Sequence, residues 1–286
     1  MIASESDGYA LGRSAAETDR LRLQAEIYGP HTAFLLTRAG IAPGTRVLDV
    51  GCGAGDVTLQ LARLVGPGGE VIGVDADPAV LGVARARAAD AGLAHVSFVE
   101  ARLPDVPLDE PVDAVVGRLI LIHLEEPAAT VRALAERVRP GGIVTFQDLV
   151  SARTRTVPAG PITTGIIGLV AAAAEAVALD VNVGERLAAI LSDAGLSVVG
   201  AASATPAGSA DSLTPRYLAE LTRSMLPLIT AHGLATEDEV DVDTLAKRIA
   251  EEMAAERAVL WLPELAAAWA RIPGRHLAGV TVEHAE

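Results

Sequence analysis

Cysteine, lysine and positive charge are all scarce in this chain of 286 residues. Cys52 is the only cysteine, so no disulfide can form within the chain. A formal net charge of −14 leaves little positive field for a polyanion, and we therefore expect no nucleic-acid partner. Lys247 is the only lysine among many arginines, which we interpret as genome composition rather than function.

Two further absences concern export and membranes. The first residues lack the basic and apolar regions of a signal peptide. The longest apolar stretch, residues 166–179, is short for a membrane span and is interrupted by Glu175. We therefore expect a cytoplasmic protein without a membrane partner. Half of the residues are apolar, which is enough for a large core in one domain with insertions or with a small cap.

The most informative segment is residues 47–55, with the sequence Val-Leu-Asp-Val-Gly-Cys-Gly-Ala-Gly. Its apolar positions predict a buried strand. The three alternate glycines predict a turn in which the backbone takes conformations that side chains resist, or in which a ligand comes very close. A helix pattern with one apolar face starts at once. Together, strand, glycine turn and helix start predict a site for a nucleotide-sized ligand.

The spacing of the glycines favours one class of ligand. A dinucleotide-binding turn has the pattern G-x-G-x-x-G and places a pyrophosphate at the helix start. Here the pattern is G-x-G-x-G, and the preceding Asp49 would repel a pyrophosphate but suit an ammonium or sulfonium group. The segment resembles the first motif of the class I S-adenosylmethionine-dependent methyltransferases. This resemblance implies S-adenosylmethionine as the cofactor, with contacts from Asp49, Gly51, Cys52 and Gly53.

A second predicted strand ends in Asp75, 24 residues after Gly51. An acid about 20 residues beyond such a turn is placed to accept hydrogen bonds from ribose hydroxyls. We therefore expect Asp75 and the adjacent Ala76 to contact the cofactor, although a solvated loop acid is the alternative. For Asp77, which precedes Pro78, we prefer the role of a helix cap.

The segment after the third predicted strand departs from the methyltransferase pattern. In that pattern an acid commonly stands here and holds the adenine amino group, whereas this chain has Arg102. An arginine has no acceptor and cannot take that hydrogen bond. Its plane could stack on the base while backbone groups of Ala101 and Leu103 contact the ring edge. Equally, Arg102 could face solvent, or Glu100 or Asp105 could replace the acid.

Five predicted strands alternate with helices along the chain. Their residue numbers are 47–50, 71–75, 95–99, 112–116 and 143–146. This alternation predicts an α/β fold with a doubly wound, mostly parallel sheet, in which ligands bind beyond the carboxyl ends of the strands. Residues 44–150 resemble the methyltransferase family continuously, which implies a Rossmann-like sheet with an antiparallel last strand. Arg118 and Asp148 fall on the ligand-binding edge, and we count Arg118 among the cofactor contacts.

Methyl transfer from a sulfonium depends more on positioning than on acid–base chemistry. Positioning can supply ~7–11 kcal/mol of the barrier reduction. A general base contributes ~10²–10⁴-fold, and only when the nucleophile carries a proton near neutral pH. His123 and Asp148 are the candidate catalytic residues at the strand edge. His123 could instead bond the backbone and Asp148 could instead orient the substrate, and no cluster of acids or histidines indicates a metal.

The amino-terminal segment predicts a cover for the cofactor. Residues 14–28 have an amphipathic pattern, and family relatives often open with a similar segment that closes over the cofactor. By that resemblance, Gln24 meets the methionine end of the cofactor and Tyr9 faces the substrate. A plain packing helix is the alternative.

The chain divides into a lid, a core, a cap and a tail in this interpretation. The boundaries are 1–40 for the helical lid, 41–205 for the core with a helical insertion at about 155–182, 206–257 for a helical cap over the substrate pocket, and 258–286 for the last core strand and the carboxyl-terminal tail.

These features predict a methyltransferase that acts on an oxygen, nitrogen or carbon nucleophile of a small-molecule metabolite, for example in natural-product biosynthesis. A homodimer is left open. Three alternatives remain: an enzyme that keeps the cofactor but performs cyclase or decarboxylase chemistry, a non-catalytic module that senses the cofactor, and a nicotinamide dehydrogenase. The glycine spacing and Asp49 oppose the last of these.

Overall fold

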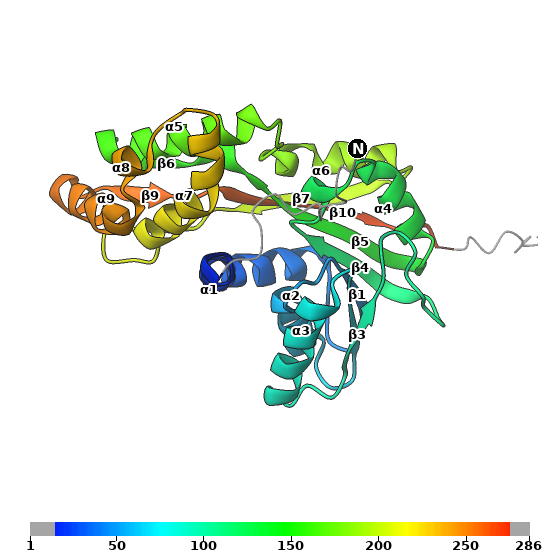
Figure 1. Cartoon of the computed structure of the whole chain (residues 1–286). Helices are drawn as coiled ribbons and strands as arrows, with labels where there is room; N and C mark the ends of the chain where they lie inside the picture. Colours follow the sequence, from blue (N-terminus) through cyan, green and yellow to red (C-terminus); the bar gives the residue numbers. More distant parts are fainter. Residues whose placement is uncertain (1–14, 275–286) are drawn as a thin grey trace, which may run out of the picture.

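The chain folds around one seven-stranded sheet (Figure 1). The computed structural model describes residues 15–274, with side chains from Arg20 onward. In spatial order the strands are β3 (Val96–Glu100), β2 (Glu70–Asp75), β1 (Arg46–Val50), β4 (Val112–Arg118), β5 (Val138–Val150), β10 (Glu264–Arg271) and β7 (Val198–Ala204). β1 to β5 pair in parallel, whereas β10 runs antiparallel to both of its neighbours. The predicted fold class, a mostly parallel, doubly wound sheet with an antiparallel strand, is confirmed.

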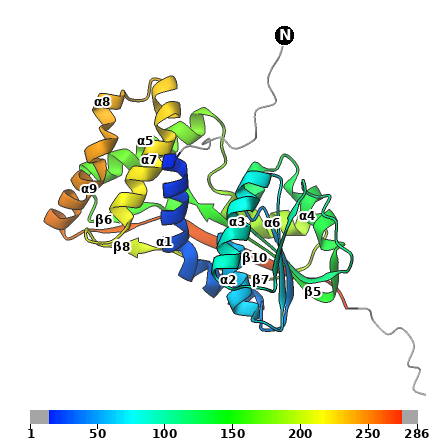
Figure 2. The ribbon, with the colours of Figure 1, turned by 60° about the horizontal axis from the view of Figure 1, so that its bottom comes forward.

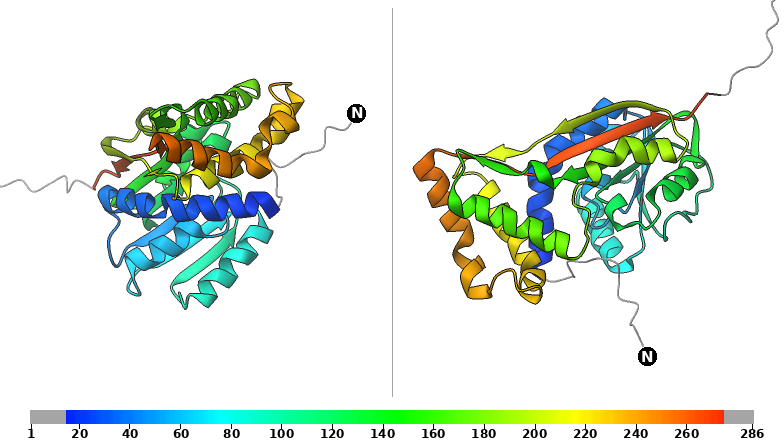
Figure 3. Two further views of the ribbon diagram at one scale, coloured as in Figure 1. Left: turned by 90° about the vertical axis from the view of Figure 1, so that its left-hand side faces the viewer. Right: turned by 90° about the horizontal axis from the view of Figure 1, so that it is seen from above.

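Helices cover both faces of the sheet (Figures 2 and 3). α1 (Ala15–Ala39), α2 (Asp56–Val65) and α3 (Pro78–Asp90) lie on one face. α4 (Pro127–Ala135) and α6 (Leu187–Asp193) lie on the other, together with the short 3₁₀ helices η1 (Leu121–His123) and η3 (Val183–Arg186). Each face of the sheet therefore has its own apolar core.

The turn from β1 into α2 is built from left-handed glycines. Gly51, Gly53 and Gly55 have φ values of +67°, +52° and +85°, a region in which a side chain would strain the backbone. Asp77 caps α3 as expected, since its carboxylate accepts a hydrogen bond from the Ala79 N–H at 2.9 Å.

A group of helices lies beside the main sheet, next in the chain to its longest strands, β5 and β10. It consists of α5 (Pro161–Ala176), α7 (Thr214–Ala231), α8 (Glu237–Val240) and α9 (Val242–Glu256). A small sheet of β6 (Arg155–Val157), β9 (Val259–Trp261) and β8 (Ala207–Gly208) lies beneath them. The last core strand, expected within residues 258–286, is preceded there by a second strand, so this segment holds β9 and β10, which belong to different sheets (Figure 1). Alanine-rich sequence favours helix locally, but β10 pairs on both sides and is extended.

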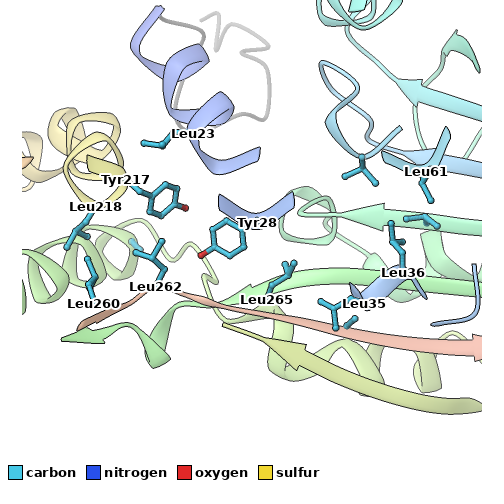
Figure 4. Close-up of a cluster of buried hydrophobic side chains, with 14 of the residues drawn as sticks. Leu23, Tyr28, Leu35, Leu36, Leu61, Tyr217, Leu218, Leu260, Leu262 and Leu265 are labelled. Atoms are coloured by element: carbon cyan, nitrogen blue, oxygen red, sulfur yellow. The ribbon is translucent and has the colours of Figure 1, made fainter. Parts of the chain in front are cut away.

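Helix α1 contacts both the main sheet and the group of helices that contains α7. Leu35 and Leu36, toward its carboxyl end, are fully buried, as are the rings of Tyr28 on α1 and Tyr217 on α7. The two tyrosine rings lie edge to face with centroids 5.9 Å apart (Figure 4). These contacts fix α1 between the two parts of the molecule.

Candidate cofactor site

The first feature of the site is the Asp75 carboxylate, which is hydrogen-bonded to the glycine turn. Asp75, at the end of β2, accepts hydrogen bonds from the Gly53 N–H at 2.9 Å and from the Asp77 N–H at 3.0 Å. The backbone is joined as well, because the Cys52 N–H donates to the Val74 carbonyl at 2.9 Å. The predicted acid and the predicted turn are therefore brought together at one point of the sheet edge.

The glycines of this turn serve two purposes. A Cβ added at Gly51 would lie 2.5 Å from Cδ1 of Ile120, so this position is closed by packing. A Cβ added at Gly53 would meet no atom within 4 Å. The space over Gly53 is therefore open to a ligand that approaches the backbone beside Asp75.

Asp49 and Cys52 lie beneath the turn rather than on its open side. The Asp49 carboxylate is buried and accepts a hydrogen bond from the Thr58 hydroxyl at 2.6 Å. Burial raises its pKa to about 7, although the Thr58 hydroxyl and the Arg118 charge oppose the shift. Burial likewise raises the pKa of the Cys52 thiol, so this buried side chain is an unreactive filler at neutral pH.

The segment after β3 is the most exposed part of the predicted site. Ala76 and Arg102 are exposed, whereas Ala101 and Leu103 are half-buried. The Ala101 N–H donates to the Asp75 carbonyl at 3.1 Å, which joins this segment to the end of β2. The role of Arg102 toward adenine stays a prediction.

Arg118, at the end of β4, points toward α1. Its guanidinium donates a hydrogen bond to the Thr32 hydroxyl at 3.1 Å. Burial lowers the pKa of Arg118, but the carboxylates of Asp56 and Asp49 favour its charged form. The next residue, Leu119, has φ +57°, and a strained non-glycine backbone of this kind is typical of functional sites.

A buried polar cluster joins α1 to α7 near the same edge of the sheet. The Gln24 side-chain oxygen accepts hydrogen bonds from Arg20 at 2.8 Å and from the Tyr217 phenol at 3.3 Å. The Tyr28 phenol donates to the Pro263 carbonyl at 2.9 Å. Burial raises the pKa of Tyr28, and the neighbouring Tyr217 raises it further. Gln24 lies on α1, and its contact with the cofactor stays a prediction, whereas Tyr9 lies outside the described residues.

Gln147 and Asp148 lie side by side on β5 but on opposite faces of the sheet. Gln147 pairs in register with Arg118 and faces α1, where its side-chain nitrogen donates to the Thr32 carbonyl at 3.4 Å. Its side-chain oxygen is buried and has no hydrogen-bond partner among the described residues. Gln147 is therefore an acceptor at the strand edge that the sequence did not single out.

Asp148 lies on the face of η1 and η3. One carboxylate oxygen accepts the Leu149 N–H at 2.9 Å, and the other is buried without a partner in the described part of the chain. Burial raises the pKa of Asp148 to about 7, although hydrogen bonds from Leu149 and Ile122 oppose the shift. His123, one residue beyond Ile122, lies at the end of η1, where partial desolvation of the ring lowers its pKa.

Comparison with known proteins finds a methyltransferase domain in the chain. A family model described as a methyltransferase domain matches residues 41–179. The ubiquinone/menaquinone biosynthesis C-methyltransferase UbiE of Pseudomonas paraeruginosa is 36% identical over 111 residues, which cover 38% of this chain and 43% of that protein. Residues 41–179 are therefore a methyltransferase domain, and this part of the chain is similar to the class I S-adenosylmethionine-dependent methyltransferases.

Solved structures support the same fold. A candidate methyltransferase from Bacillus halodurans superposes with a TM-score of 0.55 at 18% identity, covering 85% of this chain and 98% of that one. The YcgJ protein from Bacillus subtilis gives a TM-score of 0.53 at 19% identity, with the same coverage. The chain spans less than half the length of the UbiE relative, so that relative's full activity does not transfer with the match.

The residues of this domain fit S-adenosylmethionine. The open space over Gly53 lies beside the Asp75 carboxylate, which suits a ribose that donates two hydroxyl hydrogen bonds. The guanidinium of Arg118 and the unpaired oxygen of Gln147 offer a donor and an acceptor at the neighbouring strand ends. Among residues 15–274, no group of three or more His, Cys, Asp or Glu side chains could hold a metal ion.

Several residues of the candidate site were not identified from the sequence. These are Tyr28, Thr32, Gln147 and Tyr217. Gln147 had one available signal, a polar residue at the end of a buried strand. The others lie on helices, and no local pattern shows which helical side chain reaches the sheet edge.

Within the described part of the chain, none of the helices has both the length and the apolar character needed to cross a bilayer.

Proposed function

We propose that this chain transfers a methyl group from S-adenosylmethionine to an oxygen, nitrogen or carbon atom of a small molecule. The observation that carries the proposal is the bond between the Asp75 carboxylate and the Gly53 N–H, beside the open face of that glycine. A carboxylate held in this position can accept hydrogen bonds from the two hydroxyl groups of a ribose.

A small acceptor is supported by the surface charge and by the elements that flank the site. The net charge of −14 disfavours nucleic acid. At the strand ends, Thr32 of α1 contacts Arg118 and Gln147, and α7 packs on α1. We propose that α1 acts as a lid within residues 1–40, and that residues 206–257 act as a cap on the core of residues 41–205. The name of the UbiE relative specifies a carbon acceptor for that protein. For this chain the acceptor atom is open.

The residues of the chain would position the cofactor and the nucleophile and supply the charges that bind them. S-Adenosylmethionine, when bound, supplies a methyl group on a positively charged sulfur. We propose that Arg118 binds the carboxylate of the methionine end, since a guanidinium matches a carboxylate with two parallel hydrogen bonds. Gln24 and the Gln147 oxygen would bind polar groups at the same end. Holding the nucleophile in line with the methyl group can supply ~7–11 kcal/mol.

Asp148 and His123 are the proposed proton acceptors for a nucleophile that carries a proton. A carboxyl group with a pKa of about 7 is matched to general-base work near neutral pH. The unpaired oxygen of Asp148 is the atom that would receive the proton, directly or through His123. Replacing Asp148 with Asn would then lower kcat by ~10²–10⁴-fold for an acceptor of this kind.

Calorimetric titration with S-adenosylhomocysteine tests cofactor binding. We expect wild-type protein to bind and Asp75→Asn to bind at least about tenfold more weakly, because the variant loses a charged acceptor of hydrogen bonds. Asp77→Asn is the matched control, since Asn caps a helix as well as Asp does. Equal affinities of wild type and Asp75→Asn would remove Asp75 from the site.

A panel of metabolites incubated with methyl-labelled S-adenosylmethionine tests the reaction. Transfer of the label to a product, with release of S-adenosylhomocysteine, supports methyl transfer. A product without the label would indicate cyclase or decarboxylase chemistry on the same scaffold. Cofactor binding without turnover on any acceptor would indicate a non-catalytic module.

A further inference from the structure

A single arginine of α3 contacts the cofactor turn from the side. The Arg87 guanidinium donates one hydrogen bond to the Ala54 carbonyl at 2.6 Å and forms an ion pair with the Asp56 carboxylate, also at 2.6 Å. Ala54 lies between Gly53 and Gly55, and Asp56 is the first residue of α2. One side chain thus holds both the turn and the helix that follows it.

Helix α3 also packs directly on the turn. A Cβ added at Gly55 would lie 3.1 Å from the Ala84 Cβ. Ala84 and Arg87 are three positions apart on the helix and therefore face the same way. Because α3 follows β2 after Asp77, the helix that braces the turn also follows directly from the strand that carries Asp75.

The turn needs an external brace for a physical reason. Its three left-handed glycines have more conformational freedom to lose than any other residue type. Gly55, the cap of α2, provides no side-chain hydrogen bond of its own. A planar guanidinium with two bonds in a fixed geometry restricts such a turn more than a single contact would.

We propose that Arg87 is a positioning residue for the cofactor. By holding the Ala54 peptide and Asp56, it keeps the Gly53 N–H on the Asp75 carboxylate and keeps the space over Gly53 open. Arg87 does not touch the cofactor in this role. The inference rests on the proposed binding of S-adenosylmethionine at this turn.

The test compares S-adenosylhomocysteine binding by wild type, Arg87→Met, Arg87→Lys and Arg85→Met. Met keeps the stem of the side chain and removes both bonds, so affinity should fall about tenfold, the effect of one hydrogen bond to a charged group. Lys restores the charge and one bond, so its affinity should lie between the two. Arg85→Met is the control, because Arg85 lies on the same helix but donates to the Phe98 carbonyl on β3.

Hydrogen exchange separates positioning from general stability. In Arg87→Met we expect faster exchange at residues 53–56, with the β-sheet amides unchanged. Equal affinities of wild type and Arg87→Met would overturn the inference alone. If Arg87→Met does not fold, Arg87→Lys decides, and wild-type affinity in that variant would overturn it. Wild-type protein that gives no heat with S-adenosylhomocysteine would overturn the proposed function as well.

Discussion

The Tyr217 phenol on α7 donates a hydrogen bond to the Gln24 side-chain oxygen on α1 at 3.3 Å, across 193 positions of the chain. The same oxygen accepts a bond from Arg20. Gln24 therefore joins the helix over the sheet edge to the helical group beside it. We therefore predict that access to the edge depends on the stability of the contact between these two helices.

Tyr217→Phe should loosen α1 without disturbing the core. The variant keeps the ring that packs edge to face on Tyr28 and loses the hydroxyl group, whose bond to Gln24 contributes ~1 kcal/mol. We expect faster amide hydrogen exchange at residues 20–28 and a fall of ~1 kcal/mol in the free energy of unfolding, measured in urea. Unchanged exchange at residues 20–28 would show that the bond does not hold the helix.

Thr222→Val is the matched control for this variant. It also removes a buried hydroxyl from α7, but that hydroxyl bonds the Leu218 carbonyl within the same helix. Exchange in α1 should not respond to it.

Local pattern was enough to predict most of the sheet. Apolar runs that end at glycine or a polar residue located the first five strands, although β5 begins at Val138, before the predicted residue 143. The position of β10 followed from resemblance rather than from propensity. The division of 258–272 into β9 and β10 was not predictable from pattern, because Leu262 and Pro263 continue the apolar run and only pairing with different sheets separates the strands. The two tryptophans of this segment lie one in each strand.

Gly53→Ala should separate the ligand role of the turn from its backbone strain. Both Gly53 and Gly44 have positive φ, and a Cβ at either position would meet no atom within 4 Å. Ala at each should therefore cost a similar ~1–2 kcal/mol in the free energy of unfolding. Only Gly53→Ala places a methyl group in the proposed cofactor space, so only this variant should lose affinity for S-adenosylhomocysteine in calorimetry. Equal affinities of the two variants would show that the ligand does not lie against Gly53.

The candidate site was predictable only in part, and the reason is geometric. Glycine spacing and the distance to Asp75 indicated the turn, because both lie within one strand–helix–strand unit, β1–α2–β2. The side chains of Gln147 and Asp148 lie on opposite faces of the sheet. Which face each occupies is set by the register of β4 and β5, in which Arg118 pairs with Gln147. Tyr217 reaches Gln24 through packing of distant segments, for which a single sequence holds no local signal.

Two buried carboxyl groups should make the protein less stable as pH rises. Burial raises the pKa values of Asp49 and Asp148 to about 7, well above those of unfolded aspartate. Between pH 4 and 7 the folded state therefore holds more protons than the unfolded state, and the free energy of unfolding declines through this range. Urea unfolding between pH 5 and 8 should show the decline, with a shallower slope in Asp49→Asn and in Asp148→Asn.

Asp105→Asn serves as the control for the pH series. Asp105 is exposed, and its replacement should leave the slope as it is in wild type. A slope of wild-type steepness in both Asp49→Asn and Asp148→Asn would mean that neither carboxyl group is protonated more readily in the folded state.

Glu252 on α9 acts as the cap of a different helix. Gly160, which precedes α5, provides no side-chain hydrogen bond, and the Glu252 carboxylate instead accepts the N–H groups of Ile162 at 2.7 Å and Thr163 at 2.8 Å. Partial burial alone would raise the pKa of Glu252, but the bonds from Thr163 and Ile162 outweigh it and hold the pKa below its usual value. The carboxylate form is therefore the one that stabilises the contact between α5 and α9.

Glu252→Gln should lower the free energy of unfolding by ~1–2 kcal/mol at pH 7, because an amide oxygen replaces a charged cap. The lowered pKa makes this contribution present above the pKa of unfolded glutamate and lost as pH falls through the folded value. The difference between wild type and variant should therefore narrow below about pH 4. Glu251→Gln is the control: its carboxylate pairs with Lys247 at 3.6 Å on the exposed side of α9, and its loss should cost less than about 0.5 kcal/mol. Equal losses in the two variants, or a difference that does not change with pH, would show that α5 is stable without the carboxylate of Glu252.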